Sequence, residues 1–248
     1  LRDIDTYISF AAERGAKIKY ILETHFHADF VSGHLDLSKR TNAPIVYGPG
    51  ATPRFAIYSA KDGELLNIGE ISIEVMHTPG HTLESTCYLL RDEKNKPHAI
   101  FTGDTLFVGD VGRPDLSSGN MSSEELASIM YETIQNKILP LSDDIIMYPG
   151  HGAGSSCGKS LGSETYSTIG EQKKSNYALK INDKEAFVQA VTDGLGKAPV
   201  YFAVNAEINQ KGYEDVDEVT SKGSLLLSVE AFKEKIQSGA MILDLSLI

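Results

Sequence analysis

The first residues of the chain show the apolar spacing of an amphipathic helix. Ile4, Tyr7, Ile8 and Ala11 recur at intervals of three and four residues, which places them on one helical face. Gly15 follows as a typical stop, because glycine accepts the left-handed backbone that often ends a helix. The pattern therefore predicts a helix from about residue 4 to residue 15.

Short apolar runs bounded by polar or glycine-rich residues come next, and this pattern is typical of buried strands. We expect such strands at 18–24, 44–48, 64–69, 71–80, 85–91, 98–104 and 144–151. Helical patterns interrupt the series at 32–40 and at 122–141, the second with acidic residues in its first turn and a proline near its end. Strands and helices thus alternate up to about residue 152, which predicts an α/β fold.

The remainder of the chain has a different character. Residues 162–180 are polar with a helical later part, 183–196 form a further helix, and 197–219 suggest extended, irregular structure. Residues 228–246 have the order helix, glycine turn, strand, which would begin another domain. Both ends fall within patterned segments, so we expect a piece of a longer chain. The predicted divisions are a main domain (1–182), a connecting helix and linker (183–227) and the start of a second domain (228–248).

Charge and composition narrow the classes of function. The 23 Lys and Arg residues against 34 Asp and Glu residues give a net charge of −11, which repels nucleic-acid phosphates, so we expect no nucleic-acid partner. No apolar run approaches the roughly 20 residues needed to cross a bilayer, so no membrane association is expected. Two cysteines, Cys87 and Cys157, give no disulfide framework and favour a reducing, cytoplasmic location. Homo-oligomerisation is left open.

Polar side chains gather at the ends of the predicted strands. They are His25, His27 and Asp29 after the first strand, His77 and His81 in HTPGHT, Asp104 in FTGDT, Asp110 and Arg113 in GDVGRPD, and His151 in YPGHG. Strand-end loops allow such side chains to converge, and imidazole and carboxylate groups suit zinc, iron or manganese. The series predicts a metal site. His34, His77 and His98 have simpler interpretations, namely a helix residue facing solvent or the sheet, a turn cap and a surface residue.

In their order these motifs resemble the metallo-β-lactamase fold superfamily, whose marks are T-H-x-H-x-D-H, P-G-H-T, T-G-D and a late G-H. The resemblance spans about residues 18–152. It implies an αββα sandwich whose N-terminal strands are missing from this sequence. Members often bind two metals, and the last histidine of the first motif belongs to the second site. Phe30 stands at that position and has no lone pair to give, so we expect one metal rather than two.

Three segments are similar to a narrower group, the persulfide dioxygenase branch, in particular its bacterial forms fused to rhodanese-like domains. The segments are ETHFHADFVSGH, GDTLFVGDVGRPDL and PGHGAGSSCGK. The resemblance implies a single Fe(II), with zinc as the alternative metal, held by His25, His81 and Asp104. Two histidines and one carboxylate form the face that non-haem iron oxygenases use.

The same resemblance gives roles to neighbouring residues. His27, Asp29 and His151 would surround the metal and orient its ligands or hold water, which makes Asp29 and His151 candidate catalytic residues. The animal and plant members carry an aromatic residue after the late histidine motif. This chain has only small residues there, so the thiol that carries the persulfide is left open.

Two further residues are candidates for substrate binding, and the first of them, Arg113, is also a candidate catalytic residue. Arg113 would pair with a carboxylate of a thiol substrate such as glutathione, or else form a structural ion pair with Asp110 or Asp115. Cys157 lies in a glycine- and serine-rich loop, where an exposed thiol with its pKa lowered by Lys159 would meet substrate sulfur. The alternative for Cys157 is a small structural residue in a tight loop.

The predicted activity is the Fe(II)-dependent oxidation of a low-molecular-weight thiol persulfide by O2 to sulfite and thiol, in sulfide detoxification. The alternatives are a zinc-dependent, glyoxalase II-like thioesterase of the same fold and a non-catalytic sulfur-carrier module. Residues 228–248 resemble the opening helix and strand of a rhodanese-like domain, in which Asp244 would begin the turn after the strand.

Overall fold

The computed structural model describes residues 3–116, 121–224 and 226–242. The chain divides after Tyr213 into two compact units. The second unit holds helices α7 (Val216–Gly223) and α8 (Val229–Gln237). None of the helices in the described ranges combines the length and the apolar character needed to cross a lipid bilayer.

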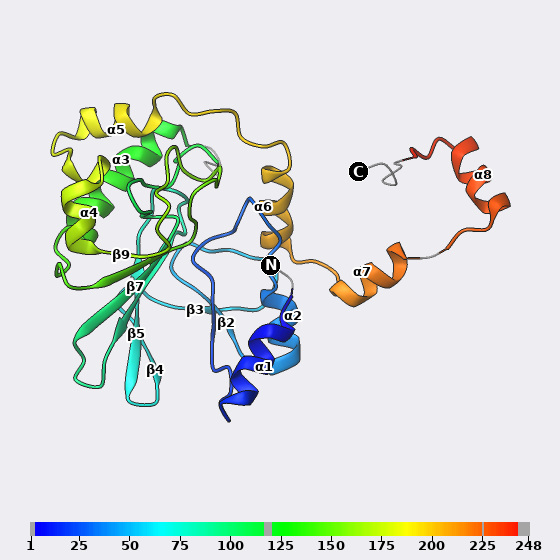
Figure 1. The fold of residues 1–248 in the computed structure, drawn as a ribbon, viewed down its shortest axis with the longest axis horizontal. Helices are drawn as coiled ribbons and strands as arrows, with labels where there is room; N and C mark the ends of the chain where they lie inside the picture. The colour runs from blue at the N-terminus through cyan, green and yellow to red at the C-terminus, as the bar shows by residue number, and fades with distance from the viewer. Residues whose placement is uncertain (1–2, 117–120, 225, 243–248) are drawn as a thin grey trace. The chain divides into compact units, whose positions relative to one another are not determined.

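Two β-sheets form the centre of the first unit (Figure 1). The smaller sheet is parallel and contains β1 (Ile21–Leu22), β2 (Ile45–Tyr47) and β3 (Tyr58–Ser59) in that order. The larger sheet runs in the order β4 (Leu65–Ile68), β5 (Ile71–His77), β6 (Thr86–Arg91), β7 (Pro97–Gly103), β8 (Ile146–Pro149) and β9 (Ser167–Thr168). Its strands pair antiparallel except for β7 and β8, which are parallel.

The helices of the first unit pack around these sheets. They are α1 (Asp5–Glu13), α2 (His34–Thr41), α3 (Ser123–Thr133) with the π-helix η1 (Ile134–Ile138), α4 (Ile169–Ser175), the 3₁₀-helix η2 (Ala178–Lys180), α5 (Lys184–Thr192) and α6 (Phe202–Lys211). The start of α3 is fixed by a capping box in which Ser122 and Glu125 each bond the other's main-chain N–H. This agrees with the acidic first turn that the sequence predicted.

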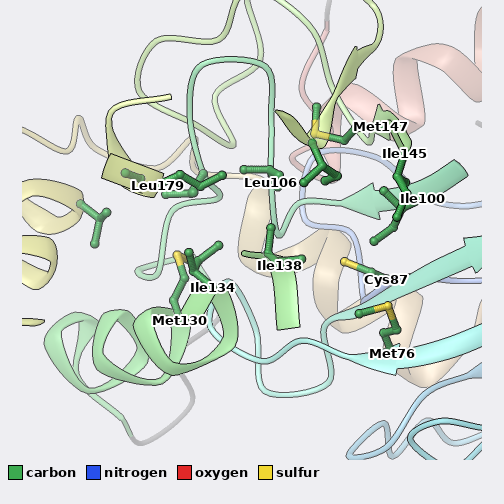
Figure 2. Close-up of a cluster of buried hydrophobic side chains, with 14 of the residues drawn as sticks. Met76, Cys87, Ile100, Leu106, Met130, Ile134, Ile138, Ile145, Met147 and Leu179 are labelled. Carbon is green, nitrogen blue, oxygen red and sulfur yellow. The ribbon is translucent and has the colours of Figure 1, made fainter. Parts of the chain in front are cut away.

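Buried side chains show that the two sheets form a sandwich. Val46 of the small sheet packs with Val75 and Tyr88 of the large sheet, between the two layers. Met76 follows Val75 in β5, and Cys87 precedes Tyr88 in β6. Both side chains face the other side of the large sheet, in the cluster that includes residues of α3 and α5 (Figure 2). This alternation follows from the two-residue period of a strand. A third cluster joins the small sheet to α2, so the layers are helix, sheet, sheet, helix. The αββα sandwich is confirmed.

Several predicted elements differ in the structure. The segment 197–219, expected to be extended and irregular, contains α6 and the first half of α7, so that prediction was wrong. The two-residue strands β3 and β9 were not predicted, because two residues show no period. Helices α5 and α6, which we placed in a connecting segment, belong to the first compact unit.

The last predicted segment is described in part. Helix α8 lies within 228–246 as expected, and Gly239 follows it with a φ of 93°, the left-handed conformation of a glycine turn. The expected strand and Asp244 fall mainly on residues 243–248, outside the described ranges.

Candidate metal centre

The candidate ligands all follow strand ends on one edge of the sandwich. His25 comes three residues after β1, His81 four residues after β5, Asp104 directly after β7, and His151 two residues after β8. These strands belong to both sheets. The fold therefore brings together loops that are separated in the sequence by up to about half the length of the chain. The polar clusters that the sequence places at strand ends are therefore neighbours in space.

His25, His81 and Asp104 form one compact group. Their ligand atoms lie within 4.8 Å of one another, and all three residues are buried. Asp104 Oδ2 lies 3.8 Å from His25 Nε2 and 3.6 Å from His81 Nε2. The two imidazole rings meet edge to face, with their centroids 4.9 Å apart. The structure thus brings together the three residues for which the sequence predicted a shared metal.

Hydrogen bonds fix the orientation of both rings. The main-chain carbonyl of Arg113 lies 2.7 Å from His81 Nδ1, and a carbonyl can only accept, so Nδ1 carries the proton. This leaves the lone pair on Nε2, the atom that faces Asp104. His25 Nδ1 similarly lies 3.0 Å from the hydroxyl of Thr24. Both Nε2 atoms are therefore directed toward Asp104 as potential metal ligands.

The charge states of the group also suit a cation. Burial lowers the pKa of His25 well below its ordinary value of 6.5, so that ring is neutral at pH 7. Burial alone would raise the pKa of Asp104, but the neighbouring His25 and His151 outweigh it, and the pKa of Asp104 falls below 3.8. Neutral imidazole and ionised carboxylate are the forms that bind metals.

Unpaired oxygens show that a cation fits here. Asp104 is 1% exposed, and neither of its carboxylate oxygens has a hydrogen-bond partner. A buried carboxylate without hydrogen bonds is costly, and native proteins rarely leave one unpaired. A metal ion between His25, His81 and Asp104 would satisfy both the charge and the lone pairs.

A second group lies beside the first. The ligand atoms of His27, Asp29 and His151 also lie within 4.8 Å of one another. His151 Nε2 is 3.4 Å from Asp104 Oδ1 and 3.5 Å from Asp29 Oδ2, while His27 Nδ1 is 4.0 Å from Asp29 Oδ1. Burial alone would lower the pKa of His151, but its contacts with Asp104 and Cys157 raise the pKa to about 11. Without a metal, His151 is therefore the cation that balances these carboxylates.

Phe30 has a packing role in this loop. Its ring stacks on His27 with the centroids 4.4 Å apart. Phe30 and His27 also form part of the wall of a cavity of about 600 Å³ between α1, β1 and the ends of β7 and β8. An aromatic side chain at this position thus replaces a potential ligand with an apolar contact.

Arg113 forms the structural ion pair that the sequence left open. Its guanidinium donates 2.9 and 2.7 Å hydrogen bonds to the two carboxylate oxygens of Asp115, and a 2.6 Å hydrogen bond to the carbonyl of Gly196. The residue is 5% exposed. Its most direct link to the metal group is the main-chain carbonyl that orients His81.

Cys157 is placed near the metal group but not as an exposed thiol. It is 2% exposed, and its sulfur, Asp104 and His151 present ligand atoms within 4.8 Å of one another. Burial raises the pKa of Cys157, whereas we expected Lys159 to lower it. Lys159 instead directs its ammonium group to the carbonyl of Ala190, 2.7 Å away. Cys87 is a core residue, as predicted.

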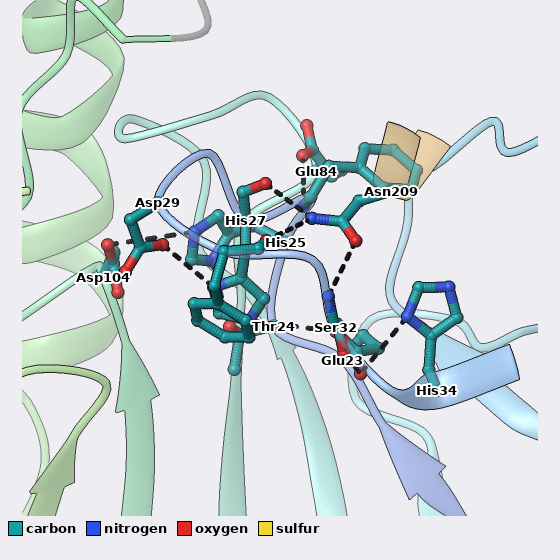
Figure 3. A network of polar contacts seen from close by, with 12 residues as sticks. Glu23, Thr24, His25, His27, Asp29, Ser32, His34, Glu84, Asp104 and Asn209 are labelled. Atoms are coloured by element: carbon teal, nitrogen blue, oxygen red, sulfur yellow. Dashed lines mark hydrogen bonds and ion pairs between the residues drawn. The ribbon is translucent and has the colours of Figure 1, made fainter. Parts of the chain in front are cut away.

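Sequence reasoning missed the residues that hold the first loop in place. Figure 3 shows Glu23, Ser32 and Asn209 around the histidines. Glu23 accepts a 2.9 Å hydrogen bond from the Ser32 hydroxyl and lies 3.8 Å from His27 Nε2. Burial raises the pKa of Glu23 to about 7. The acidic residue directly before T-H-x-H was a signal that could have been followed, whereas Asn209 had no neighbouring motif to mark it.

The other histidines lie outside the metal group. His34 is buried against Phe55 and Tyr213 and faces Glu23, so it does not point to solvent. His77 contacts the carbonyl of Leu83 through Nε2 at 2.8 Å. His98 is exposed, as the sequence predicted.

Comparison with known proteins agrees with this arrangement. The family model of the metallo-beta-lactamase superfamily matches residues 3–151. The probable hydroxyacylglutathione hydrolase glo2 of Schizosaccharomyces pombe is 34% identical over 140 residues, which are 56% of this chain and 50% of that protein. The chain thus spans half the length of this relative.

Solved structures show the same fold. A metallo-beta-lactamase from Staphylococcus aureus is 38% identical with a TM-score of 0.80, over 86% of this chain and 64% of that one. ETHE1 from Myxococcus xanthus is 27% identical with a TM-score of 0.71, over 85% of this chain and 84% of that one.

Proposed function

Because the chain belongs to the metallo-beta-lactamase superfamily, we propose that it is an Fe(II)-dependent persulfide dioxygenase. It oxidises a low-molecular-weight thiol persulfide such as glutathione persulfide, as part of sulfide detoxification. The balanced reaction is R–S–SH + O2 + H2O giving R–SH and sulfurous acid, which ionises to sulfite. The outer sulfur is oxidised, both atoms of O2 are reduced, and the S–S bond breaks.

The observation that carries this proposal is the group of His25, His81 and Asp104, in which the Nε2 atoms of two imidazoles and one carboxylate face a common point. This is the ligand set of non-haem iron oxygenases, and it leaves several coordination positions for substrates. When bound, Fe(II) supplies the redox chemistry with O2 that no amino-acid side chain can provide. The similarity to ETHE1 supports the same branch of the superfamily.

The remaining polar residues have roles that follow from their positions. His27, neutral because burial lowers its pKa, faces Asp29 and can hold water there. His151 Nε2 lies between the carboxylates of Asp29 and Asp104, where it can hold a proton and give it to the departing thiolate. Asp29 and His151 are therefore the proposed catalytic residues beside the metal.

Two residues act around this centre. Arg113 is a positioning residue, because its carbonyl fixes the His81 ring while its guanidinium is held by Asp115. Cys157 lies against His151 and Asp104, and we propose that it contacts the sulfur of the substrate. Since Cys157 is buried, this contact is made inside the site rather than at the surface.

The wider setting is also proposed rather than observed. Both cysteines are free, which supports a reducing, cytoplasmic location. Residues 228–248 would begin a rhodanese-like domain, and α8 with the Gly239 turn fits the first part of that expectation. Such a fused domain would exchange sulfur with the persulfide that the first unit oxidises.

A zinc-dependent thioesterase of the glyoxalase II type is the second candidate. It is favoured by the similarity to the probable hydroxyacylglutathione hydrolase glo2. The second group of His27, Asp29 and His151 offers additional ligands, as a two-metal hydrolase would require. Phe30 counts against it, because an aromatic side chain adds no ligand to that group.

Metal analysis combined with two assays separates the candidates. Protein purified without added metal is analysed for iron and zinc, then tested for O2 uptake with glutathione persulfide and for hydrolysis of a hydroxyacylglutathione thioester. About one iron per chain with O2 uptake supports the dioxygenase. Two zinc ions per chain with thioester hydrolysis and no O2 uptake would overturn it. His81→Ala is the control, because loss of a metal ligand should abolish either enzymatic activity. If the protein were instead a non-catalytic sulfur-carrier module, this substitution would leave its function intact.

A further inference from the structure

We propose that Glu84 is a positioning residue for the metal group, because its carboxylate ties the loop that carries His25 to the loop that carries His81. Figure 3 shows Glu84 beside the first of these loops. The inference deepens the proposed function, since it rests on the metal group of that function. It does not depend on which reaction the metal catalyses.

Glu84 follows His81 by three residues in the sequence HTLES, so both belong to the loop between β5 and β6. Glu84 Oε1 accepts a 3.1 Å hydrogen bond from the main-chain N–H of Phe26, the residue between His25 and His27. Glu84 is 8% exposed, and within the described residues this N–H is the hydrogen-bond partner of its side chain. Loss of the acceptor would leave a buried N–H unpaired, which costs more than the bond itself adds.

The loop of Glu84 holds His25 from both sides. The N–H of Thr86 donates a 2.9 Å hydrogen bond to the carbonyl of Thr24, directly before His25, whereas Glu84 holds the N–H of Phe26, directly after it. That N–H belongs to the planar peptide group that joins His25 to Phe26, so its hydrogen bond fixes the main chain next to the His25 Cα atom. Without it, the main chain on this side of His25 loses its anchor to the other loop.

The loop that carries Glu84 is itself rigid, as the role of a positioning residue requires. Within its turn, the N–H of Thr82 donates a 3.0 Å hydrogen bond to Ser85 Oγ. The loop also lies very close to the main chain after β2, because a Cβ atom at Gly48 would overlap Thr86 Oγ1. The carboxylate therefore projects from a fixed main chain and can hold the other loop in place.

A small displacement of one ring would be felt at the metal. The Nε2 atoms of His25 and His81 lie 3.8 and 3.6 Å from Asp104 Oδ2. Metal–imidazole bonds are about 2.0–2.1 Å long, so a shift of a few tenths of an ångström changes the coordination. Removing a group that orients a metal ligand typically weakens metal binding by about 10- to 100-fold. Glu84 acts through the main chain rather than on a ring nitrogen, so we expect the lower end of that range.

Cobalt(II) binding, after removal of the resident metal, tests this role. Chelator competition gives the affinity, and the visible ligand-field absorption of cobalt reports the geometry of its ligands. Glu84→Met keeps an unbranched side chain but has no oxygen acceptor, so we expect about tenfold weaker binding and a changed ligand-field spectrum. Glu84→Gln keeps a carbonyl oxygen that can accept from the Phe26 N–H. It should therefore bind within about twofold of wild type and show the wild-type spectrum.

Two controls separate positioning from general stability. Leu83→Ala changes the neighbouring side chain, which is 44% exposed, and should leave the affinity and the spectrum unchanged. Leu66→Ala empties part of the cluster between the sheets, which contains no residue of either ligand loop. It should lower the melting temperature, because it creates a cavity, while the cobalt spectrum stays that of wild type.

Two results would overturn the proposal. One is Glu84→Met with the affinity and spectrum of wild type. The other is a folded Glu84→Gln protein that binds cobalt about tenfold more weakly, because the hydrogen-bond acceptor would then not be what matters. The second result does not require Glu84→Met to fold. Neither depends on O2 uptake, so failure of this role and failure of the dioxygenase proposal are distinguishable.

Discussion

Asn209 of α6 donates a 2.7 Å hydrogen bond to the main-chain carbonyl of His27, a residue 182 positions earlier in the chain. The same amide donates a 2.7 Å hydrogen bond to the carbonyl of Phe30 and accepts a 2.9 Å hydrogen bond from the N–H of Ser32. Asn209 is 1% exposed. One buried side chain thus satisfies three main-chain groups of the loop that carries the first metal ligands.

We predict that Asn209→Asp weakens iron binding about tenfold, in line with the usual effect of groups that support metal ligands. Aspartate has nearly the same shape and keeps the acceptor for Ser32, but it loses both donors, which leaves the carbonyls of His27 and Phe30 unpaired. Affinity is measured by competition with a chromophoric chelator.

Asn205 provides the matched control, one turn earlier on the same helix and half-buried. Asn205→Ala should leave the iron affinity within about twofold of wild type, since within the described residues its side chain makes no hydrogen bond to the loop that carries His25 and His27. Equal losses in the two variants would show that α6 acts only through general stability.

We also predict that Gly150→Ala weakens iron binding by about tenfold while the fold persists. A Cβ atom at Gly150 would lie 2.6 Å from Asp104 Oδ1, so the carboxylate would have to move away from its position. The same Cβ atom would lie 3.0 and 3.1 Å from the main-chain carbon and oxygen of Gly103, which need to yield only slightly, whereas the Asp104 carboxylate must shift further. The main effect is therefore on the geometry of the metal group. Circular dichroism checks the fold, and chelator competition measures the affinity.

Gly152→Ala is the control in the same loop. A Cβ atom there would meet nothing within 4 Å. We expect wild-type iron affinity for this variant. If both substitutions weaken binding to the same extent, the effect comes from loop flexibility and not from contact with Asp104.

The sequence predicted which candidate ligands come together far better than it predicted the framework that holds them. His25, His81 and Asp104 lie in short motifs at strand ends, and strand ends are recognisable from apolar runs, so their meeting could be anticipated. Asn209 lies in a segment without strong periodicity, and its three partners are about 180 residues away. Nothing local in a sequence reveals such a contact.

The fold shows the same contrast. The αββα order could be inferred from motifs, and the strands from β4 to β8 were found because each is a short apolar run bounded by polar residues or glycine. Of these strands, only β5 and β6 have no exposed residue on either face. Helix α6 was missed because its buried face rests on few residues, mainly Phe202 and Asn209, one of which is polar. The role of the Arg113 side chain could not be predicted, because its sequence context was compatible with a substrate carboxylate and with a structural ion pair. The structure shows the ion pair with Asp115.

His34 should make stability depend on pH. Burial, followed by the nearby His27, lowers its pKa from 6.5 to about 4. As the pH falls below 6.5, His34 binds a proton in the unfolded chain, whereas in the folded chain it stays neutral until about pH 4. The contribution of His34 to the free energy of unfolding is therefore lost between pH 6.5 and pH 4. At pH 5 the loss amounts to about 2 kcal/mol.

We therefore predict that the free energy of unfolding of wild type falls by about 2 kcal/mol more than that of His34→Phe when the pH is lowered from 7.5 to 5. Urea unfolding of both proteins at both pH values gives this difference, and the comparison cancels the other titrating groups. An identical difference between the two proteins at both pH values would contradict the assignment.

The most direct test of the central claim is the ratio of O2 consumed to sulfite formed when iron-loaded protein meets glutathione persulfide. The account predicts one sulfite per O2 in wild type and no enzymatic O2 uptake in His81→Ala. Iron-loaded wild type that consumes no O2, although His25, His81 and Asp104 hold the metal, would contradict it.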